Sequence, residues 1–250
     1  MGAAVGAVLR AGGHGVVWAS AGRSGESRRR AEAAGLEDAG SVSELVSRSD
    51  LIFSICPPHA ALDVATTVAG FRGVFVDANA VAPATASSLA AFVEAGGGRC
   101  VDGGIVGPPP VQAGTTRLYL SGPAAATVSA LFSGSVIDAR VVSDEVGAAS
   151  AVKMAYAGWT KGTAALLIAI RELARREGVE AALLEEWSLS LPELSDRFRR
   201  AHRSAQAKGW RWVGEMEEIA ATFSAAELPD GFHLAAAEVF RTLSADRAHE

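Results

Sequence analysis

Residues 147–178 read GAASAVKMAYAGWTKGTAALLIAIRELARREG, and this stretch decides the fold. It holds no proline, and nearly every position is a good or tolerable helix former, so it predicts one long helix. Asp144 or Ser143 is expected to cap its start, and Gly178 to end it in a left-handed turn. Because the helix is apolar on almost all sides, we expect it to be buried.

One lysine stands out in the first turns of this apolar helix. Lys153, Tyr156 and Thr160 follow a three-then-four spacing, which places them on one helix face. Lys161 lies about 80° round from Lys153, at about 100° per residue, and is expected to face elsewhere. A lysine on an apolar helix must be paired, reach solvent with its amine, or line a cavity. We favour a cavity where two domains meet, with a snorkelling or salt-bridged lysine as the simpler alternative.

The composition of the 250-residue chain limits the classes of protein it can be. Hydrophobic residues make up 49% and charged residues 20%, which supports a sizeable core and argues against disorder. The net charge of −5 gives no reason to expect a nucleic acid or an anionic membrane as partner. No apolar run suits a membrane span, and the first residues do not resemble a secretory signal. Two cysteines, Cys56 and Cys100, favour a reducing cytoplasm and give no sign of a disulfide framework or a metal site.

Strand-like and helix-like segments alternate through the first 143 residues. Strands are predicted over 15–20, 50–56, 73–77, 99–102, 116–121 and 136–142, and helices over 1–12, 26–34, 42–46, 59–69, 84–95 and 123–132. The alternation is typical of a Rossmann-type, doubly wound and mostly parallel sheet with helices on both faces.

The strand signal stops near residue 144, and only helical patterns follow. Further helices are predicted over 180–190, 192–208, 213–226 and 231–243. We therefore expect a dinucleotide-binding α/β domain over 1–143, and an all-helical domain for substrate binding and dimerisation over 144–250.

Open parallel sheets bind ligands beyond the carboxyl ends of their strands. After the strand that ends at Ser20, the loop carries Arg23 and Ser24 but no acidic residue. A dinucleotide-binding fold meets the adenosine ribose at this point, so these residues, with Arg28 nearby, are expected to bind a 2′-phosphate. This favours NADP over NAD as the cofactor. A solvated basic loop is the alternative.

Two further strand ends offer contacts for a cofactor. After Cys56, the Pro57-Pro58 pair predicts either a stiff ledge against a nucleotide or a simple stop to the strand. After Asp77, Asn79 offers an amide that can bind the cofactor or cap the next helix.

The fourth strand end is rich in glycine. Residues 102–110 read DGGIVGPPP. A turn through Gly103, Gly104 and Ile105 would let backbone amides approach an anionic group of the substrate, or would only reverse the chain. Thr160 is the expected helical contribution to the same substrate.

The first residues match only part of a familiar motif. A dinucleotide-binding fold normally starts with a strand that leads into G-x-G-x-x-G and then a helix. This sequence starts with MGAAVGAV, at what looks like the end of that motif. Met1 and Gly2 are therefore the expected contacts to the cofactor here.

Together these segments resemble the β-hydroxyacid dehydrogenase superfamily, which includes 3-hydroxyisobutyrate and 6-phosphogluconate dehydrogenases and the related imine reductases. Met1-Gly2 resembles the end of the G-x-G-x-M-G motif, so the resemblance implies an N-terminal truncation. Residues 77–83 resemble D-x-S-T-x-x-P, residues 102–108 resemble the substrate segment D-A-P-V-S-G-G, and residues 147–153 resemble G-x-G-x-x-x-K. The resemblance covers essentially the whole chain and implies that Lys153 is the catalytic residue.

The sequence departs from the superfamily where substrates bind. Tyr156 and Ala157 stand where an asparagine is usual, and Val106 replaces the serine of V-S-G-G. Glu215-Met216 takes the place of a lysine-aspartate pair. These departures disfavour 3-hydroxyisobutyrate and 6-phosphogluconate as substrates, and they leave room for a less polar carbonyl or imine.

The expected activity is NADP-dependent hydride transfer between nicotinamide and a small hydroxy acid, carbonyl or imine. Lys153 would give or take the proton, provided that burial lowers its pKa toward neutrality. Tyr156 is expected to orient the substrate or to be the proton donor itself, and Lys161 is the second candidate. Because the glycine loop is cut, the alternative is a non-catalytic or defective protein for nucleotide binding or protein interaction.

A long helix that is apolar all round exceeds what one small helical domain can bury, which predicts a homodimer. The tryptophans at 159, 187, 210 and 212 are expected in the core or in dimer contacts rather than as substrate clamps.

Overall fold

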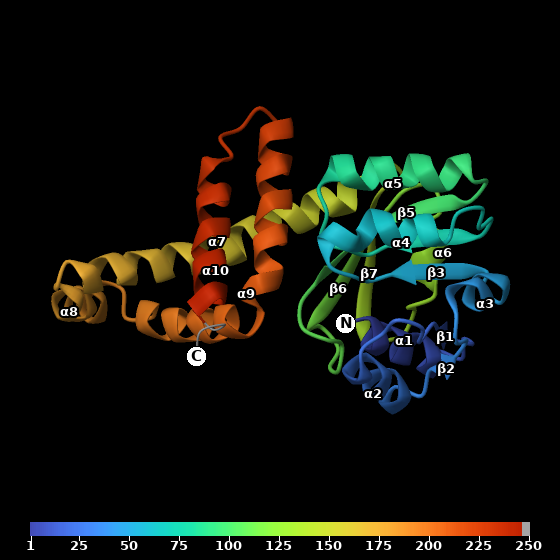
Figure 1. Cartoon of the computed structure of the whole chain (residues 1–250), viewed down its shortest axis with the longest axis horizontal. Coiled ribbons are helices and arrows are strands. Elements are labelled where there is room, and N and C mark those ends of the chain that lie inside the picture. Colours follow the sequence, from blue (N-terminus) through green and yellow to red (C-terminus); the bar gives the residue numbers. More distant parts are fainter. Residues whose placement is uncertain (247–250) are drawn as a thin grey trace. The chain divides into compact units, whose positions relative to one another are not determined.

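The structure is a computed structural model that describes residues 1–246 (Figure 1). The chain divides into two compact units, Met1–Lys153 and Met154–Glu250. The first unit contains every strand of the described residues, and the described part of the second is helical. No helix within residues 1–246 is long and apolar enough to cross a bilayer.

Strands and helices alternate in the first unit, as the sequence predicted. The strands are β1 Val17–Trp18, β2 Glu37–Asp38, β3 Leu51–Ser54, β4 Val74–Asp77, β5 Arg99–Val106, β6 Thr116–Ser121 and β7 Ile137–Ser143. The helices are α1 Gly2–Ala11, α2 Gly25–Ala33, α3 Val42–Ser47, the short 3-10 turn η1 Pro58–Ala60, α4 Ala61–Thr67, α5 Pro83–Ala95 and α6 Ala125–Ala130.

Five strands form one sheet in the order β3-β4-β5-β6-β7 (Figure 1). All neighbouring pairs are parallel except β5 and β6, which are antiparallel. The predicted, mostly parallel sheet is therefore confirmed. Strands β1 and β2 form a separate parallel pair. Strand β2 was not predicted, because Glu37 and Asp38 are exposed and polar and carry no strand pattern.

Both faces of the large sheet are covered by helices. On β4, the side chains of Val74 and Val76 pack with residues of α1 and α6, whereas Phe75 packs with residues of α4 and α5. All of β4 is buried, which explains its continuous run of apolar residues.

Strand β5 continues through the predicted glycine-rich turn, so that prediction is wrong. Gly103 lies opposite Leu120 and Gly104 opposite Tyr119 in the antiparallel ladder with β6. Long-range pairing with β6 overrides the local turn tendency of two glycines. The chain leaves the strand only at Gly107, whose φ of +115° is a conformation that L side chains rarely adopt.

The second unit consists of α8 Glu180–Ser190, α9 Leu194–Ala225 and α10 Gly231–Asp246, together with most of α7 Ala148–Arg176. The predicted break between two helices near residues 208–213 is absent, because α9 runs through it. There Gly209 is buried, and Trp212 packs on Phe240 with ring centroids 5.1 Å apart. Trp187 is also buried, whereas Trp159 and Trp210 are exposed.

Candidate active site

The first turn of α7 is bound by a carboxylate from the sheet. Asp102 lies in β5 and is 1% exposed. Its Oδ2 accepts hydrogen bonds from the Ser121 hydroxyl at 2.9 Å, from the backbone N–H of Gly147 at 3.0 Å and from that of Ser150 at 2.9 Å. Its Oδ1 accepts from the Ser150 hydroxyl at 2.6 Å. Asp102 thus satisfies N–H groups that a helix start leaves without partners.

The predicted side-chain caps at the start of α7 are therefore wrong, whereas Gly178 after its end has the predicted left-handed conformation, with a φ of +71°. The Ser143 hydroxyl accepts from the N–H of Glu145, before the helix begins. Asp144 makes no hydrogen bond to α7 within residues 1–246. A buried carboxylate from a neighbouring strand meets the same need as a local cap, and sequence spacing cannot reveal it.

Lys153 lies one turn further along α7, against the same strand. Its amine donates a hydrogen bond to the carbonyl oxygen of Ile105 at 2.7 Å. The side chain is partly buried, and this burial lowers the pKa of Lys153 to about 8. No carboxylate pairs with the amine in the described part of the chain. A lysine in this state can both donate and accept a proton near neutral pH.

Gly104 lets β5 and α7 approach closely. A Cβ atom on Gly104 would lie 2.8 Å from the carbonyl oxygen of Ala149 and 3.0 Å from Cβ of Lys153. The role of this glycine is close packing beside the lysine, and its backbone belongs to the β5–β6 ladder. Of the predicted substrate residues, the structure thus brings Gly104 and Ile105 next to Lys153, and Ile105 accepts the hydrogen bond from its amine.

Asn79 joins the carboxyl ends of β3 and β4. Its side-chain oxygen accepts from the N–H of Cys56 at 2.5 Å. Its amide nitrogen donates to the Ser54 hydroxyl at 3.0 Å and to Oδ1 of Asp77 at 2.5 Å. Both amide hydrogens are therefore used inside the protein, a structural role that sequence reasoning missed.

Asp77 is a further group that sequence reasoning missed. Its Oδ2 is buried and has no hydrogen-bond partner within residues 1–246. Burial raises the pKa of Asp77 to about 7, and the nearby negative charge of Asp102 raises it further, against the hydrogen bond from Asn79. The sequence signal was a lone acidic residue at the end of an otherwise apolar strand.

Replacing Asp77 by asparagine should change the pH dependence of stability. The pKa of Asp77 in the folded protein lies above the unfolded value of 3.8. The stabilisation that protonated Asp77 gives the folded state is therefore fully present below pH 3.8 and is lost as pH rises through about 7. The variant lacks that loss. Its free energy of unfolding relative to wild type should rise by on the order of 2–4 kcal/mol between about pH 4 and pH 8.

Urea unfolding at several pH values measures this difference. Asp63→Asn, which changes an exposed aspartate of the same unit, is the matched control and should show no such trend. Parallel pH curves for wild type and Asp77→Asn would mean that Asp77 ionises normally in the folded protein.

The predicted nucleotide side gathers near the end of β3. Gly2 begins α1, and a Cβ atom on it would lie 3.8 Å from Cβ of Ile55. Met1 is exposed beside it. Arg23 is exposed and makes no ion pair within residues 1–246. Burial raises the pKa of the Cys56 thiol, and the positive charge of Arg23 partly opposes this rise. Arg23 and Cys56, which are far apart in sequence, are thus close enough to interact.

The loop after β1 contains an unexpected acid. Ser24 caps α2 by accepting from the N–H of Ser27 at 3.2 Å, and Arg28 donates to the carbonyl oxygen of Ser20 at 3.3 Å. Asp38 also reaches this loop, where a hydrogen bond from the Ser20 side chain holds the pKa of Asp38 below its ordinary value. No acidic residue follows β1 directly in the sequence, as the prediction said. In the folded protein, however, Asp38 of β2 lies next to this loop.

Pro57 and Pro58 lie in the turn after β3. Pro57 precedes the 3-10 turn, and its carbonyl oxygen accepts from the N–H of Ala60 at 3.0 Å. Pro58 is buried, while Pro57 and Cys56 are partly exposed. The structure is compatible with both predicted roles, the ledge and the strand stop.

The remaining predicted residues belong to the second unit. Tyr156 is 48% exposed, and the exposed Thr160 donates its hydroxyl to the carbonyl oxygen of Tyr156 at 3.2 Å. Lys161 forms an ion pair with Glu215, in which both side chains are largely buried. Because a carboxylate already balances the charge of Lys161, Lys153 is the stronger candidate for the proton-transfer role.

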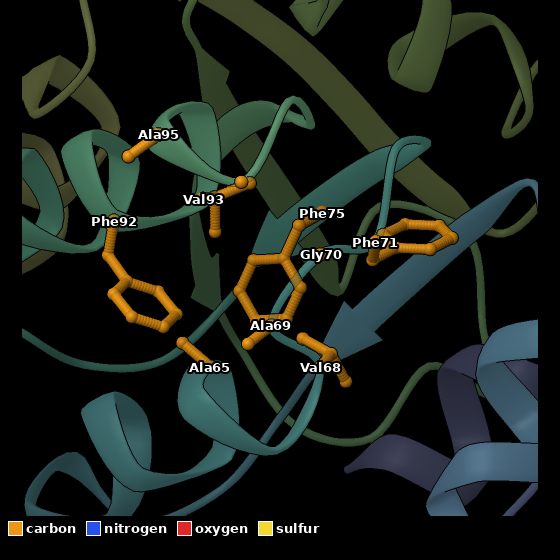
Figure 2. Close-up of a pocket in the computed structure, with 10 residues that line it drawn as sticks. Ala65, Val68, Ala69, Gly70, Phe71, Phe75, Phe92, Val93 and Ala95 are labelled. Atoms are coloured by element: carbon orange, nitrogen blue, oxygen red, sulfur yellow. The ribbon is translucent and has the colours of Figure 1, made fainter.

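An apolar cavity of about 260 Å³ lies between α4 and α5, away from these residues. Figure 2 shows the rings of Phe75 and Phe92 pointing into this space. Gly70 and Phe71, which also line it, precede β4, whereas Asp77 ends that strand. The cavity contains no predicted site residue, and no group of side chains in the described part of the chain is arranged to hold a metal.

Comparison with known proteins identifies relatives of both parts of the chain. Residues 174–243 match a family model described as a domain of unknown function, DUF1932. A relative from Methanothermus fervidus, described as an uncharacterized 28.5 kDa protein in the 7S RNA 5′ region, is 30% identical over 165 residues. That match covers 66% of this chain and 63% of the relative, which is less than two thirds of the relative's length.

Solved structures resemble almost the whole chain. A conserved protein of unknown function, reported to be structurally similar to 3-hydroxyacid dehydrogenases, is 27% identical with a TM-score of 0.69, covering 98% of this chain and 94% of that one. The 3-hydroxyisobutyrate dehydrogenase of Salmonella typhimurium is 19% identical with a TM-score of 0.72, covering 99% and 91%. A reductive aminase from Aspergillus terreus, in complex with NADPH and ethyl levulinate, is 19% identical with a TM-score of 0.58, covering 98% and 90%. The chain has the fold of the β-hydroxyacid dehydrogenase superfamily, and the resemblance noted in its sequence is confirmed.

Proposed function

We propose that this protein is an NADP-dependent oxidoreductase that acts on a small carbonyl compound or imine, or on the corresponding hydroxy acid or amine. The observation that carries the proposal is the amine of Lys153, which is held on the Ile105 carbonyl at 2.7 Å and has no carboxylate partner among residues 1–246. The fold supports it, because relatives of this fold include a dehydrogenase and a reductase that binds NADPH.

The proposed role of Lys153 is to move a proton. NADPH, when bound, supplies the hydride that reduces the substrate carbon. Lys153 gives its proton to the oxygen or nitrogen of the substrate and regains one from solvent. With a pKa of about 8, the amine is mostly protonated at neutral pH yet loses its proton more easily than an ordinary lysine. In the reverse direction, the neutral amine accepts the proton.

The residues at the nucleotide side fit a phosphorylated dinucleotide. Arg23 is an exposed guanidinium without an ion pair among the described residues, next to the start of α2 at Gly25. Guanidinium groups and helix N-termini both favour phosphate oxygens. The proposed cofactor side is completed by the other predicted residues at the strand ends, which are Met1, Gly2, Ser20, Ser24, Cys56, Pro57, Pro58 and Asn79. Asp38 accepts from the N–H of Gly40 at 2.7 Å, so part of its capacity for a ribose hydroxyl is already used.

Replacing Arg23 by alanine should raise the Kd for NADPH about tenfold, which corresponds to about 1.4 kcal/mol, and should leave the Kd for NADH unchanged. Nucleotide fluorescence titration measures both. Arg29→Ala is the matched control, because Arg29 is an exposed arginine already paired with Glu26. Equally weakened binding of NADPH and NADH would exclude a contact of Arg23 with the 2′-phosphate. If wild type and variants all bind NADH more tightly than NADPH, the ribose hydroxyl would be assigned to Asp38.

The activity itself is tested by NADPH oxidation against ketones, 2-keto and 3-keto acids and cyclic imines. We expect turnover of the less polar carbonyls or imines. Absence of NADPH and NADH binding would reject an oxidoreductase and leave the alternative of a protein that binds partners without catalysis. Tyr156 and Thr160 keep their substrate roles as predictions, and the cytoplasmic location also stays a prediction.

We also propose that the protein is a homodimer. Four large hydrophobic side chains of α7 are exposed: Tyr156 (48%), Trp159 (65%), Leu166 (44%) and Leu173 (61%). Their spacing places them on one side of the helix. Such an apolar stripe on a long helix suits a second copy of the chain.

Replacing Trp159 by glutamate should shift the protein from dimer to monomer, because a charge would be buried in the interface. Size-exclusion chromatography with light scattering measures the mass. Leu62→Glu, at a 49% exposed leucine of the first unit, is the control and should stay dimeric. A monomeric wild-type protein would refute the dimer.

A further inference from the structure

We infer that Asp102 is a positioning residue: it holds the first turn of α7 so that the amine of Lys153 stays on the carbonyl oxygen of Ile105. The inference rests on the proton-transfer role of Lys153 in the proposed function. Asp102 does not touch Lys153, and it acts through the backbone of the helix that carries the lysine.

The side-chain hydrogen bonds to the helix start come from two strands. Asp102 in β5 receives hydrogen bonds from the N–H groups of Gly147 and Ser150, and from the Ser150 hydroxyl. The Ser121 hydroxyl in β6 accepts from the N–H of Ala149 at 3.0 Å and donates to Asp102 at 2.9 Å. Three N–H groups at the helix start are therefore satisfied by side chains that lie 28 to 48 residues earlier in the sequence than the N–H groups they bind.

A carboxylate is well suited to this task. It has enough lone pairs for all its donors, and its negative charge is favourable at the positive end of a helix. Because Asp102 is 1% exposed, water does not replace these contacts when one is lost. The start of α7 is thus fixed to β5 in one orientation.

The same strand then meets the lysine. Moving along β5, Asp102 contacts the first turn of α7, Gly104 lies against Ala149 and Lys153, and Ile105 accepts from the lysine amine. Strand and helix therefore run together in a fixed register over this short distance. If the helix start loosened, the amine would leave the carbonyl and water would reach it.

Loosening has a measurable consequence at the lysine itself. Burial alone lowers the pKa of Lys153 from 10.5 to about 8. Access of water would return it toward 10.5. At pH 7 a complete return would reduce the fraction of neutral amine about 300-fold, at tenfold for each pKa unit.

The test uses Ser150→Ala and Asp102→Asn in the full-length protein. Ser150→Ala removes the 2.6 Å bond to Oδ1 and keeps the backbone contact. Asp102→Asn places an amide donor among the N–H groups of the helix. Ser129→Ala is the matched control, because it also removes one serine hydrogen bond of the first unit, to the carbonyl oxygen of Ala139 at 3.1 Å, and Ser129 makes no hydrogen bond to α7 within residues 1–246. Competitive labelling with acetic anhydride across pH, read by mass spectrometry, gives the pKa of Lys153 without any substrate.

We expect Ser150→Ala to reduce the neutral fraction of Lys153 at pH 7 at least threefold, Asp102→Asn at least tenfold, and Ser129→Ala not at all. The pH above which kcat/KM for NADPH-dependent reduction falls should rise in the same order of variants. If folded Ser150→Ala labels like wild type, the positioning role is overturned, and this holds even where Asp102→Asn does not fold. If the variants change the labelling but wild type never oxidises NADPH, the proposed function fails while the positioning role stands.

Discussion

Replacing Lys153 by methionine is expected to lower kcat/KM for NADPH-dependent reduction by about 10²–10⁴-fold, the usual contribution of a positioned proton donor. Methionine keeps an unbranched apolar stem in a partly buried position and removes only the amine and its bond to Ile105. The fold should therefore persist, which thermal unfolding by circular dichroism checks. Steady-state NADPH oxidation measures the loss of rate.

Two companion variants separate the chemistry of Lys153 from its charge and from Lys161. Lys153→Arg retains a positive charge but cannot release a proton near neutral pH, so it should be nearly as inactive as Lys153→Met. Lys161→Met leaves the largely buried Glu215 without its ion-pair partner, so its main effect should be on stability. A Lys153→Met enzyme with wild-type activity would transfer the proposed role to Lys161 or Tyr156.

The pH profile gives an independent check on the same residue. Reduction needs the protonated amine, whose pKa is about 8, so the rate should fall about tenfold per pH unit above that value. Oxidation of the product needs the neutral amine and should rise up to the same pH. The residual activity of Lys153→Met should lack this break.

Replacing Gly104 by alanine is expected to lower the free energy of unfolding by about 1–3 kcal/mol and kcat/KM by about 100-fold. The new Cβ would lie 2.8 Å from the backbone carbonyl oxygen of Ala149 and 3.0 Å from Cβ of Lys153. Backbone at the start of α7 cannot give way while Asp102 holds it, so β5 and α7 must separate. That separation would move the lysine amine off Ile105.

Gly15→Ala is the matched control for this substitution. Nothing lies within 4 Å of a Cβ built on Gly15, and its φ is not positive, so the change should alter stability by less than about 0.5 kcal/mol. Urea unfolding and NADPH oxidation of both variants measure the two effects. A Gly104→Ala protein as stable and as active as Gly15→Ala would show that strand and helix are not tightly packed at the lysine.

Much of the fold could be predicted from local pattern. The continuous apolar run of β4 predicted a strand that is covered on both faces. In the structure β4 is fully buried, with Phe75 facing one side of the sheet and Val76 the other. The long helix α7 was recognisable from its length, its lack of proline and its glycine ends. Such features depend on residues that are close in sequence, so the sequence records them directly.

The predictions that failed depended on residues far apart in sequence. The strand β5 extends through Gly103 and Gly104 because β6 pairs with it, and α9 continues through Gly209, which is buried beside α10. The exposed β2 formed only because β1 lies beside it. In each case tertiary contact outweighed a weak local tendency.

By itself the sequence determined an α/β part followed by helices, and it singled out Lys153, because a charge in an apolar helix is a local anomaly that burial must resolve. Only the tertiary structure decided the state of that lysine. Its hydrogen bond to Ile105, the glycine contact at Gly104 and the capping by Asp102 join residues 45 to 49 positions apart. A hydrogen bond depends on distance and direction in space, and neither is encoded in the spacing of residues along the chain.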